Sequence, residues 1–330
     1  MDLSAIFAFS AVNLFAGSVS GHLALRWRRP ASNSALLFGG LRHAVGVERL
    51  RDEEIRPLVR AALAEDIGTG DVTTLATVPE TARASALMRA RATLVVAGLA
   101  LAEVAFSEAS RDVRIDRQAD DGQRVAASAT LLSLEGPARA LLSAERVALN
   151  FVQRLSGIAT LAAQFVEAVK GTGARILDTR KTTPGWRRLE KYAVACGGAT
   201  NHRFGLYDMV LIKDNHLAAL SGEGPNPIAA AVQRARARYP KLKIEVEADT
   251  LEQVEQALAA GAELILLDNM DPEQLRTAVQ KCKGRAQTEA SGGVTLASVR
   301  AIAEAGVDFI SVGALTHSAV AADIGLDFEL

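Results

Sequence analysis

The chain has 330 residues, enough for two domains of ordinary size. Hydrophobic residues make up 49% and charged residues 23%, a globular composition that excludes a largely disordered protein. The formal net charge is −1, so no overall positive field favours nucleic acid as a partner, and any anion site must be local. Cys196 and Cys282 form neither a CxxC pair nor a zinc motif, which is typical of a reduced, cytoplasmic protein.

The first fifty residues show no consistent hydrophobic period. Segment 3–25 has no Asp, Glu, Lys or Arg and precedes RWRRP, so its length would suffice to cross a bilayer. However, it contains Asn13 and several Ser and Gly, and no basic region precedes it, which argues against an anchor or a targeting peptide. We therefore expect residues 1–50 to be a poorly structured extension, and we expect no membrane partner.

The first predicted elements follow Leu50. RDEEIRPLVRAALAEDI places apolar side chains on one helical face, and GTGDVTT ends that helix. Segments 81–97 and 124–135 are rich in β-forming residues, and Asp-Gly at 121–122 marks a turn. Pro137 then precedes a long run of helix-forming residues, as is typical of a helix start.

The pattern changes after about residue 170, where short apolar strands alternate with amphipathic helices. This alternation predicts a parallel sheet. With a seventh strand expected around residues 191–204, the set fits a closed or nearly closed α/β barrel, and a doubly wound open sheet is the alternative. No GxGxxG follows any strand, so a dinucleotide site is unsupported. The six visible strands are predicted at 174–178, 209–214, 243–248, 262–269, 286–292 and 308–314.

Polar residues stand at the carboxyl ends of all six strands. In a barrel these ends meet on one rim, where active sites lie. Polar residues also mark the places where strands leave a core, but six ends of such consistent chemistry indicate a functional cluster. Its members are Asp178, Arg180, Lys181, Lys213, Asp214, Glu245, Glu247, Asp268, Asn269, Ser291, Gly292, Gly293, Gly313 and Ala314.

These residue types indicate a polyanionic ligand. Arg180 offers a bidentate fork for a carboxylate or phosphate, and Lys181 and Lys213 offer point charges. Glu247 and Asp268 suit sugar hydroxyls or Mg²⁺, and the glycine turns of the last two strands suit a phosphate held by backbone N–H groups. We therefore predict a ligand with a phosphate, a sugar and a metal ion.

Some of these signals have a second interpretation. Lys213 lies in an apolar strand, where an unpaired buried lysine is costly, and it could instead be the Schiff-base nucleophile of a barrel aldolase. His202 beside Arg203 is more often structural when taken alone. Cys196 has no paired base in view, which predicts a packed thiol.

A series of motifs beyond residue 50 carries a family resemblance. They are EDIGTGDVTT (65–74), ERVALNFVQRLSGIAT (145–160), DTRKTTPGWRRLEKYAV (178–194), GGATNHRFGLYDMVLIKDNH (197–216), EVEADTLEQ (245–253), LLDNM (266–270), ASGGV (290–294) and VGALTHSA (312–319). In order and spacing they resemble the quinolinate phosphoribosyltransferases, the carboxylating nicotinate-nucleotide pyrophosphorylase family. Departures at Trp186, Ala195 and Ala199–Thr200 fall on no matched ligand position.

The resemblance implies an enzyme that converts quinolinate and phosphoribosyl pyrophosphate (PRPP) into nicotinate mononucleotide, pyrophosphate and CO₂ with Mg²⁺, a step of NAD biosynthesis. It implies an N-terminal α/β sandwich domain, expected over residues 51–160. It also implies a C-terminal α/β barrel with fewer than eight strands, expected over 161–330. A homodimer with shared active sites is implied as well, and assembly beyond the dimer stays open.

By motif position the resemblance also implies roles for single residues. Arg146 would enter the partner's site, and Arg180, His202 and Arg203 would bind the quinolinate carboxylates, with Thr179 beside them. Lys181 and Lys213 would reach a substrate carboxylate and the PRPP phosphates as catalytic residues. Glu247 and Asp268 would serve the ribose and Mg²⁺, directly or through water. The phosphate-binding turns would be Ser291, Gly292, Gly293, Val312, Gly313 and Ala314.

Two further alternatives remain at this point. A sugar-phosphate sensor could keep the barrel and lose catalysis, although the carboxylates at 247 and 268 argue against it. A related phosphoribosyltransferase acting on another aromatic acid is the nearer alternative, because the shape of a specificity pocket cannot be read from sequence.

Overall fold

The computed structural model describes residues 49–220 and 226–329. The expected extension, residues 1–50, lies outside this part of the chain except for its last two residues. Within the two described ranges, no helix combines the length and the apolar run that crossing a bilayer requires.

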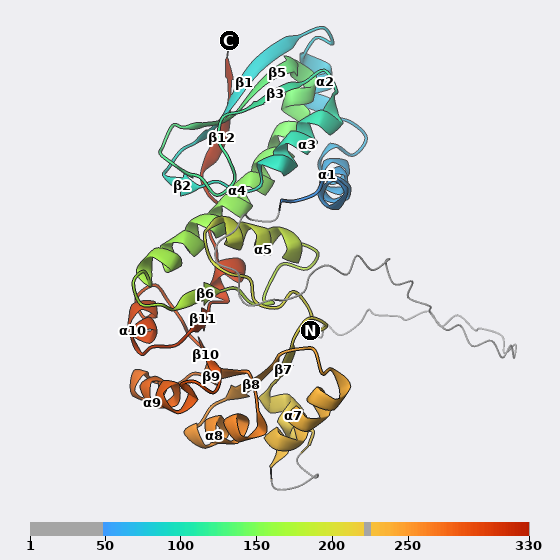
Figure 1. Ribbon diagram of the computed structural model, residues 1–330. Coiled ribbons are helices and arrows are strands. Elements are labelled where there is room, and N and C mark those ends of the chain that lie inside the picture. The colour runs from blue at the N-terminus through green and yellow to red at the C-terminus, as the bar shows by residue number, and fades with distance from the viewer. Residues whose placement is uncertain (1–48, 221–225, 330) are drawn as a thin grey trace, which may run out of the picture. The chain divides into compact units, whose positions relative to one another are not determined.

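A four-stranded antiparallel sheet organises the N-terminal part of the described chain (Figure 1). Its strand order is β12-β1-β5-β3, and alternate side chains of β1, such as Met88, are fully buried. One face of the sheet is therefore part of the core, as expected for a half-buried strand pattern. The bounds are β1 Arg83–Ala90, β3 Arg114–Arg117, β5 Thr130–Pro137 and β12 Ile324–Glu329, with helices α1 Asp52–Ile67, α2 Val72–Thr77 and α3 Leu99–Ala109, and a small pair β2 Leu94–Val95 and β4 Arg124–Val125.

The long helix α4 (Ala138–Ala168) begins directly after Pro137, as the sequence predicts. It packs on α3 and contacts strands of both large sheets. Gly157 allows a close approach at the middle of the helix, because a Cβ there would lie only 2.0 Å from the carbonyl oxygen of Val320. The segment that leads into β12 can therefore cross α4 at this point.

The C-terminal sheet has six parallel strands in the order β6-β11-β10-β9-β8-β7. All six strands predicted from the sequence are confirmed, and so is a barrel of fewer than eight strands. Helices alternate with the strands along the chain, which is the usual way that parallel strands are connected. The strands are β6 Arg175–Leu177, β7 Val210–Ile212, β8 Ile244–Ala248, β9 Leu264–Asp268, β10 Gln287–Ser291 and β11 Phe309–Ser311; the helices after β7 are α6 Asp214–Ala218, α7 Pro227–Arg238, α8 Leu251–Ala260, α9 Pro272–Cys282, α10 Val299–Glu304 and α11 Ala314–His317.

The seventh strand expected around 191–204 is wrong. Helix α5 (Arg187–Cys196) occupies the first part of that segment, and only Thr200 forms a parallel bridge, to Leu177. The helix forms because Leu189, Tyr192 and Cys196 recur at helical spacing and are buried on a face that packs on α4. The bridge at Thr200 still places the following residues beside β6, at the rim of the barrel.

The predicted division into residues 51–160 and 161–330 stays a prediction. The structure adds that α4 runs continuously through residue 160, and that β12 pairs with β1 in the N-terminal sheet. The last strand of the chain therefore contributes to the sheet built by the earlier segment.

Candidate functional site

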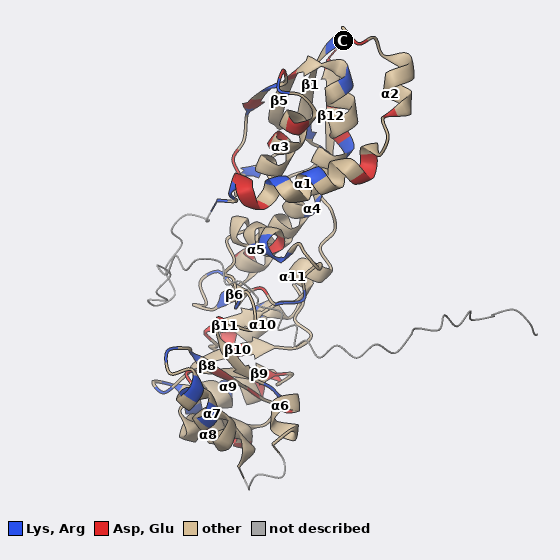
Figure 2. Ribbon diagram, turned by 90° about the vertical axis from the view of Figure 1, so that its right-hand side faces the viewer, with Lys and Arg blue, Asp and Glu red and all other residues tan. Residues whose placement is uncertain are grey.

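A cavity of about 800 Å³ lies at the carboxyl ends of the six parallel strands. Acidic and basic residues both occur around this sheet (Figure 2). Every residue to which the family resemblance assigns a role lines the cavity except Arg146, which is exposed on α4. Of the wider cluster predicted at the strand ends, Asp214 and Glu245 do not line it. The predicted residues on its wall are Thr179, Arg180, Lys181, His202, Arg203, Lys213, Glu247, Asp268, Ser291, Gly292, Gly293, Val312, Gly313 and Ala314.

Two arginines give the cavity a positively charged wall. The buried Nε of Arg180 has no hydrogen-bond partner among the described residues. Desolvation lowers the pKa of Arg203, and the positive charge of Arg180 lowers it further. Two guanidinium groups that repel each other on a cavity wall are well placed to bind an anion, and Arg can do so in a bidentate manner.

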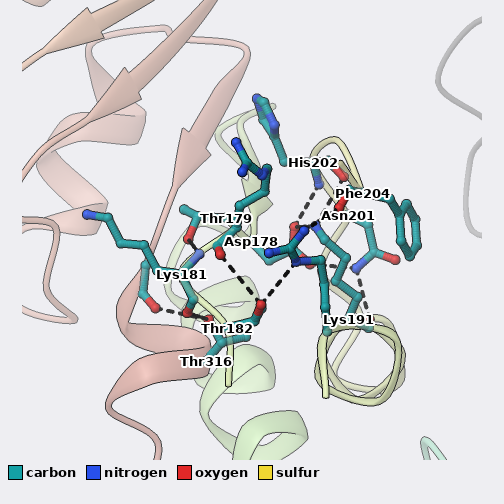
Figure 3. Close-up of polar contacts among 12 residues, drawn as sticks. Asp178, Thr179, Lys181, Thr182, Lys191, Asn201, His202, Phe204 and Thr316 are labelled. Carbon is teal, nitrogen blue, oxygen red and sulfur yellow. Dashed lines mark hydrogen bonds and ion pairs between the residues drawn. The ribbon is translucent and has the colours of Figure 1, made fainter. Parts of the chain in front are cut away.

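The carboxylate of Asp178 accepts hydrogen bonds from Lys191, Asn201 and the backbone of His202 (Figure 3). One of its oxygens accepts hydrogen bonds from Lys191 Nζ at 2.5 Å and from the His202 backbone N–H at 2.8 Å. The other accepts from Asn201 Nδ2 at 2.8 Å. Because Asp178 directly precedes Thr179 and Arg180, these bonds fix the loop after β6 relative to the loop that carries His202.

Lys191, which is not among the residues predicted from the sequence, is fully buried and lies 5.2 Å above the ring of Phe204. The expected seventh strand includes this residue, and a strand does not predict its position on a helical face. The spacing of Leu189, Tyr192 and Cys196 was the available signal for α5.

Thr179 and Lys181 are held by local backbone bonds. Thr179 Oγ1 accepts a hydrogen bond from the Lys181 N–H at 3.0 Å, and Thr316 Oγ1 donates to the Lys181 carbonyl at 2.8 Å. Thr316, which is fully buried, was also missed by the sequence analysis. Thr179 thus stabilises the turn that carries Arg180 and Lys181.

The imidazole of His202 lies between two buried carboxylates. Its Nε2 is 3.1 Å from Glu245 Oε2 and 3.2 Å from Glu289 Oε2. Burial alone would lower the pKa of His202, but hydrogen bonds and charges from both glutamates raise it to about 10. Glu289, which is not among the residues predicted from the sequence, is 1% exposed and comes from β10.

The acidic side of the cavity is formed by Glu247 and Asp268. Lys213 Nζ lies 2.5 Å from Glu247 Oε2, and the lysine side chain is 43% exposed. The premise that Lys213 is buried and unpaired is therefore wrong, because the short strand β7 ends before it. Burial raises the pKa of Asp268, and the negative charges of Glu247 and Asp249 raise it further. Carboxylates that repel each other fit a divalent cation such as Mg²⁺, which prefers oxygen ligands.

Glycine turns after β10 and β11 form a further part of the cavity wall. Gly292 has φ +97°, and a Cβ there would lie 2.1 Å from Asn269 Oδ1, so the turn admits no side chain without movement. Asn269 itself has φ +54° and donates its N–H to the Ser291 carbonyl at 3.0 Å. Gly313 is also confined, since a Cβ there would lie 3.1 Å from Lys181 Cδ. Backbone groups thus approach the cavity closely.

The prediction that Cys196 is a packed thiol is confirmed. Its side chain is buried, and burial raises the pKa of the thiol to about 12, with a further contribution from Asp121. A thiol that stays protonated at neutral pH is a poor nucleophile.

The fold and the polar cavity at the strand ends are those of an α/β-barrel enzyme. The chain belongs to the quinolinate phosphoribosyl transferase family. The model of the family's N-terminal domain matches residues 71–156, and that of its C-terminal domain matches residues 158–327. The family resemblance and the transferase class predicted from the motifs are thereby confirmed.

Individual relatives agree with this. The chain is 46% identical over 278 residues to the nicotinate-nucleotide pyrophosphorylase (carboxylating) of Mycobacterium leprae, covering 82% of this chain and 96% of that protein. It is 43% identical to a probable nicotinate-nucleotide pyrophosphorylase (carboxylating) of Bacillus subtilis, covering 84% and 94%. The solved structure of the nicotinate-nucleotide pyrophosphorylase from Francisella tularensis matches with a TM-score of 0.81 and 38% identity, covering 87% of this chain and all of that one.

Proposed function

We propose that this protein transfers the phosphoribosyl group of PRPP to quinolinate and releases pyrophosphate and CO₂, giving nicotinate mononucleotide for NAD biosynthesis. Family membership supports the reaction. The single observation that carries the site assignment is the cavity wall on which Arg180 and Arg203 face each other without an ion-pair partner among the described residues. A substrate with two adjacent carboxylates would satisfy both.

Quinolinate would bind at this cationic wall. Arg180 and Arg203 offer guanidinium donors, and His202 lies beside them on the same cavity. Hydrogen bonds between charged groups are roughly twice as strong as neutral ones, and those of arginine also fix orientation. The dianion would thereby be held with its ring nitrogen directed at the sugar.

PRPP would bind across the rest of the cavity. The turns at Ser291–Gly293 and Val312–Ala314 offer backbone groups for its phosphates. Lys181 and Lys213 would contact the remaining negative charge, and Glu247 and Asp268 would accept hydrogen bonds from the ribose hydroxyls.

Glu247 and Asp268 would also hold Mg²⁺, in contact or through water, together with the pyrophosphate oxygens. When bound, this ion would neutralise negative charge on the departing pyrophosphate. The lysines act in the same direction, because Lys213 Nζ already lies beside Glu247 and can turn towards a phosphate.

The chemistry needs no covalent nucleophile from the protein. The bond from ribose C1 to pyrophosphate breaks as the quinolinate nitrogen forms a bond to C1, through a transition state with positive charge on the sugar. The resulting pyridinium accepts the electron pair left at C2 when CO₂ departs, and a proton from solvent then completes the product. The protein contributes orientation and preorganised charge, the two effects that supply most rate acceleration in such sites.

A homodimer with shared sites completes the proposal. Arg146 is exposed on α4 and lies outside the cavity of its own chain, which is compatible with a role in the site of a second subunit. We further propose a cytoplasmic enzyme, because the substrates are soluble anions and the two described cysteines are free thiols.

A coupled assay tests the function. Purified protein with Mg²⁺ should release CO₂ and pyrophosphate in equal amounts from quinolinate and PRPP. Nicotinate in place of quinolinate is the control substrate, and it should yield no CO₂. Pyrophosphate release from nicotinate at the rate seen with quinolinate would instead indicate a related transferase for another aromatic acid.

A further inference from the structure

Glu245 and Glu289 form a buried acidic pair inside the barrel. They come from β8 and β10, which flank β9, and they are 0% and 1% exposed. Neither lies in the set of residues assigned above to quinolinate, PRPP or Mg²⁺. Buried carboxylates without a counter-charge are costly, so their presence together requires an explanation.

His202 is the cation that these carboxylates share. Its Nε2 is hydrogen-bonded to Glu245 Oε2 at 3.1 Å and lies 3.2 Å from Glu289 Oε2 as an ion pair, whereas Glu245 Oε1 and Glu289 Oε2 have no hydrogen-bond partner among the described residues. An N–H at Nε2 donates to Glu245 and places positive charge beside Glu289, whereas an unprotonated nitrogen would leave three acceptors facing one another. The geometry therefore favours a proton on Nε2.

The other groups around His202 are also charged. Its backbone N–H donates to Asp178, its carbonyl accepts from Lys191 Nζ at 3.2 Å, and Arg180 and Arg203 share its cavity wall. The two arginines disfavour a further cation, while Glu245, Glu289 and Asp178 favour it. The glutamates are the nearest of these groups to the ring, so their charges have the largest effect on its protonation.

We propose that Glu245 and Glu289 are positioning residues that hold His202 as an imidazolium, with Nε2–H donated to Glu245, the positive charge beside Glu289, and Nδ1–H left to donate to a carboxylate of the substrate. The inference rests on the proposed assignment of His202 to quinolinate. Within the described residues, Nδ1 has no hydrogen-bond partner, and the side chain lines the cavity. The pair thus converts a residue that is half protonated near neutral pH into a fixed cation.

Nitrogen-15 NMR of the histidine rings in the free enzyme tests the charge directly. The chain has five histidines, so the spectrum is simple, and His202→Gln identifies the relevant signals. Both ring nitrogens of His202 should be protonated at pH 8, and the ring should lose its proton only as the pH rises through about 10. A ring that is neutral at pH 8, with its proton on one nitrogen, would overturn the proposal.

Kinetics of Glu245→Gln and Glu289→Gln test the consequence. Each should raise KM for quinolinate on the order of 10- to 100-fold, the usual value of a charged hydrogen bond, and leave KM for PRPP unchanged. The alkaline limb of kcat/KM for quinolinate should move towards neutral pH. Glu252→Gln on α8, whose side chain is exposed, is the matched control and should have no effect. Unchanged KM and an unchanged alkaline limb in both variants would contradict the proposal.

The outcome separates this inference from the assignment on which it rests. If His202→Gln binds quinolinate as tightly as the wild type by calorimetry, the assignment of His202 to quinolinate fails, whatever its charge. If His202→Gln weakens binding while the wild-type ring is neutral, the assignment holds and the role of the glutamates fails. The wild-type NMR measurement decides the charge even where a glutamate variant does not fold.

Discussion

Lys191 Nζ lies 2.5 Å from Asp178 Oδ1, and neither side chain is exposed to solvent. Burial raises the pKa of Asp178 and lowers that of Lys191, while the charge of each favours the charged form of the other. The pair lies directly behind the loop of Arg180 and the loop of His202. The strength of this ion pair therefore affects how firmly the loops of Arg180 and His202 are fixed in the cavity wall.

Removing one member of this pair should destabilise the protein strongly. Lys191→Met leaves a buried carboxylate without its cation, so we expect a loss of about 3–5 kcal/mol in the free energy of unfolding. Combining it with Asp178→Asn should cost less than the sum of the single changes. Lys170→Met, at an exposed ion pair with Glu167, is the control and should cost less than about 1 kcal/mol. Urea denaturation at fixed protein concentration measures all four variants, and strict additivity at Lys191 and Asp178 would contradict the coupling.

Arg180 should matter for its shape as well as its charge. Arg180→Lys keeps one positive charge but loses the planar, bidentate donor, so kcat/KM for quinolinate should fall about 10²–10³-fold. Arg180→Ala should abolish turnover. Neither change removes an ion pair between described residues, and repulsion of Arg203 is relieved, so the melting temperature should stay within a few degrees of the wild type. Wild-type activity in the lysine variant would show that a simple point charge suffices.

Gly292→Ala should impair binding of PRPP selectively. The new Cβ would lie 2.1 Å from Asn269 Oδ1 at a residue with φ +97°, so the turn must shift. Gly284→Ala is the matched control, because Gly284 also has a positive φ, +74°, but nothing lies within 4 Å of its Cβ position. Both variants should lose about 1–2 kcal/mol of stability from backbone strain. Only Gly292→Ala should raise KM for PRPP in steady-state assays. An equal KM for PRPP in the two variants would contradict a role of the Gly292 turn in binding PRPP.

The sequence allowed the rim of the barrel to be predicted because its pattern is local. Each parallel strand is a short apolar run, and the polar residue after it lies on the rim whatever the distant chain does. Arg180, Glu247 and Asp268 could therefore be assigned to one cavity from separate segments. Pro137 likewise marks the start of α4 by its own backbone geometry.

Pairings between distant segments could not be predicted in this way. No local sequence feature at Lys213 predicts that Glu247, 34 residues later, lies beside it. Lys191 was missed because burial of a lysine depends on a partner, Asp178, that only the folded chain brings into contact. The seventh strand was wrong because Leu189, Tyr192 and Cys196 recur at helical spacing and two glycines follow them, a pattern that favours the helix α5.

Lys213 distinguishes a transferase from an aldolase. Its ion pair with Glu247 is partly exposed, at 43% and 11%, so Lys213→Met should change the free energy of unfolding by no more than about 1 kcal/mol. It should reduce kcat about 10²–10³-fold, as loss of a preorganised charge does. Treatment of the wild type with borohydride and a small keto-sugar phosphate should leave its mass unchanged. A covalent adduct on Lys213, found by mass spectrometry, would favour Schiff-base chemistry instead.

Arg146 provides the test of shared active sites. In the proposed dimer, Arg146→Ala and Arg203→Ala should each be inactive alone, because one would lack the arginine that enters the partner's site and the other lacks part of its own cavity wall. In a heterodimer of the two, one site would combine the intact barrel of one subunit with the intact Arg146 of the other. Random reassociation of equal amounts makes about half of the dimers mixed, so about a quarter of the wild-type activity should return.

The control for this experiment mixes Arg180→Ala with Arg203→Ala. Both changes lie on the wall of the same cavity, so no mixed dimer contains an intact site and no activity should return. Subunit exchange is verified in both mixtures by mass spectrometry with one isotope-labelled partner. If exchange is complete and the Arg146→Ala mixture is as inactive as the control, Arg146 does not act across a dimer interface, because the only site that could recover activity would have been formed and found inert.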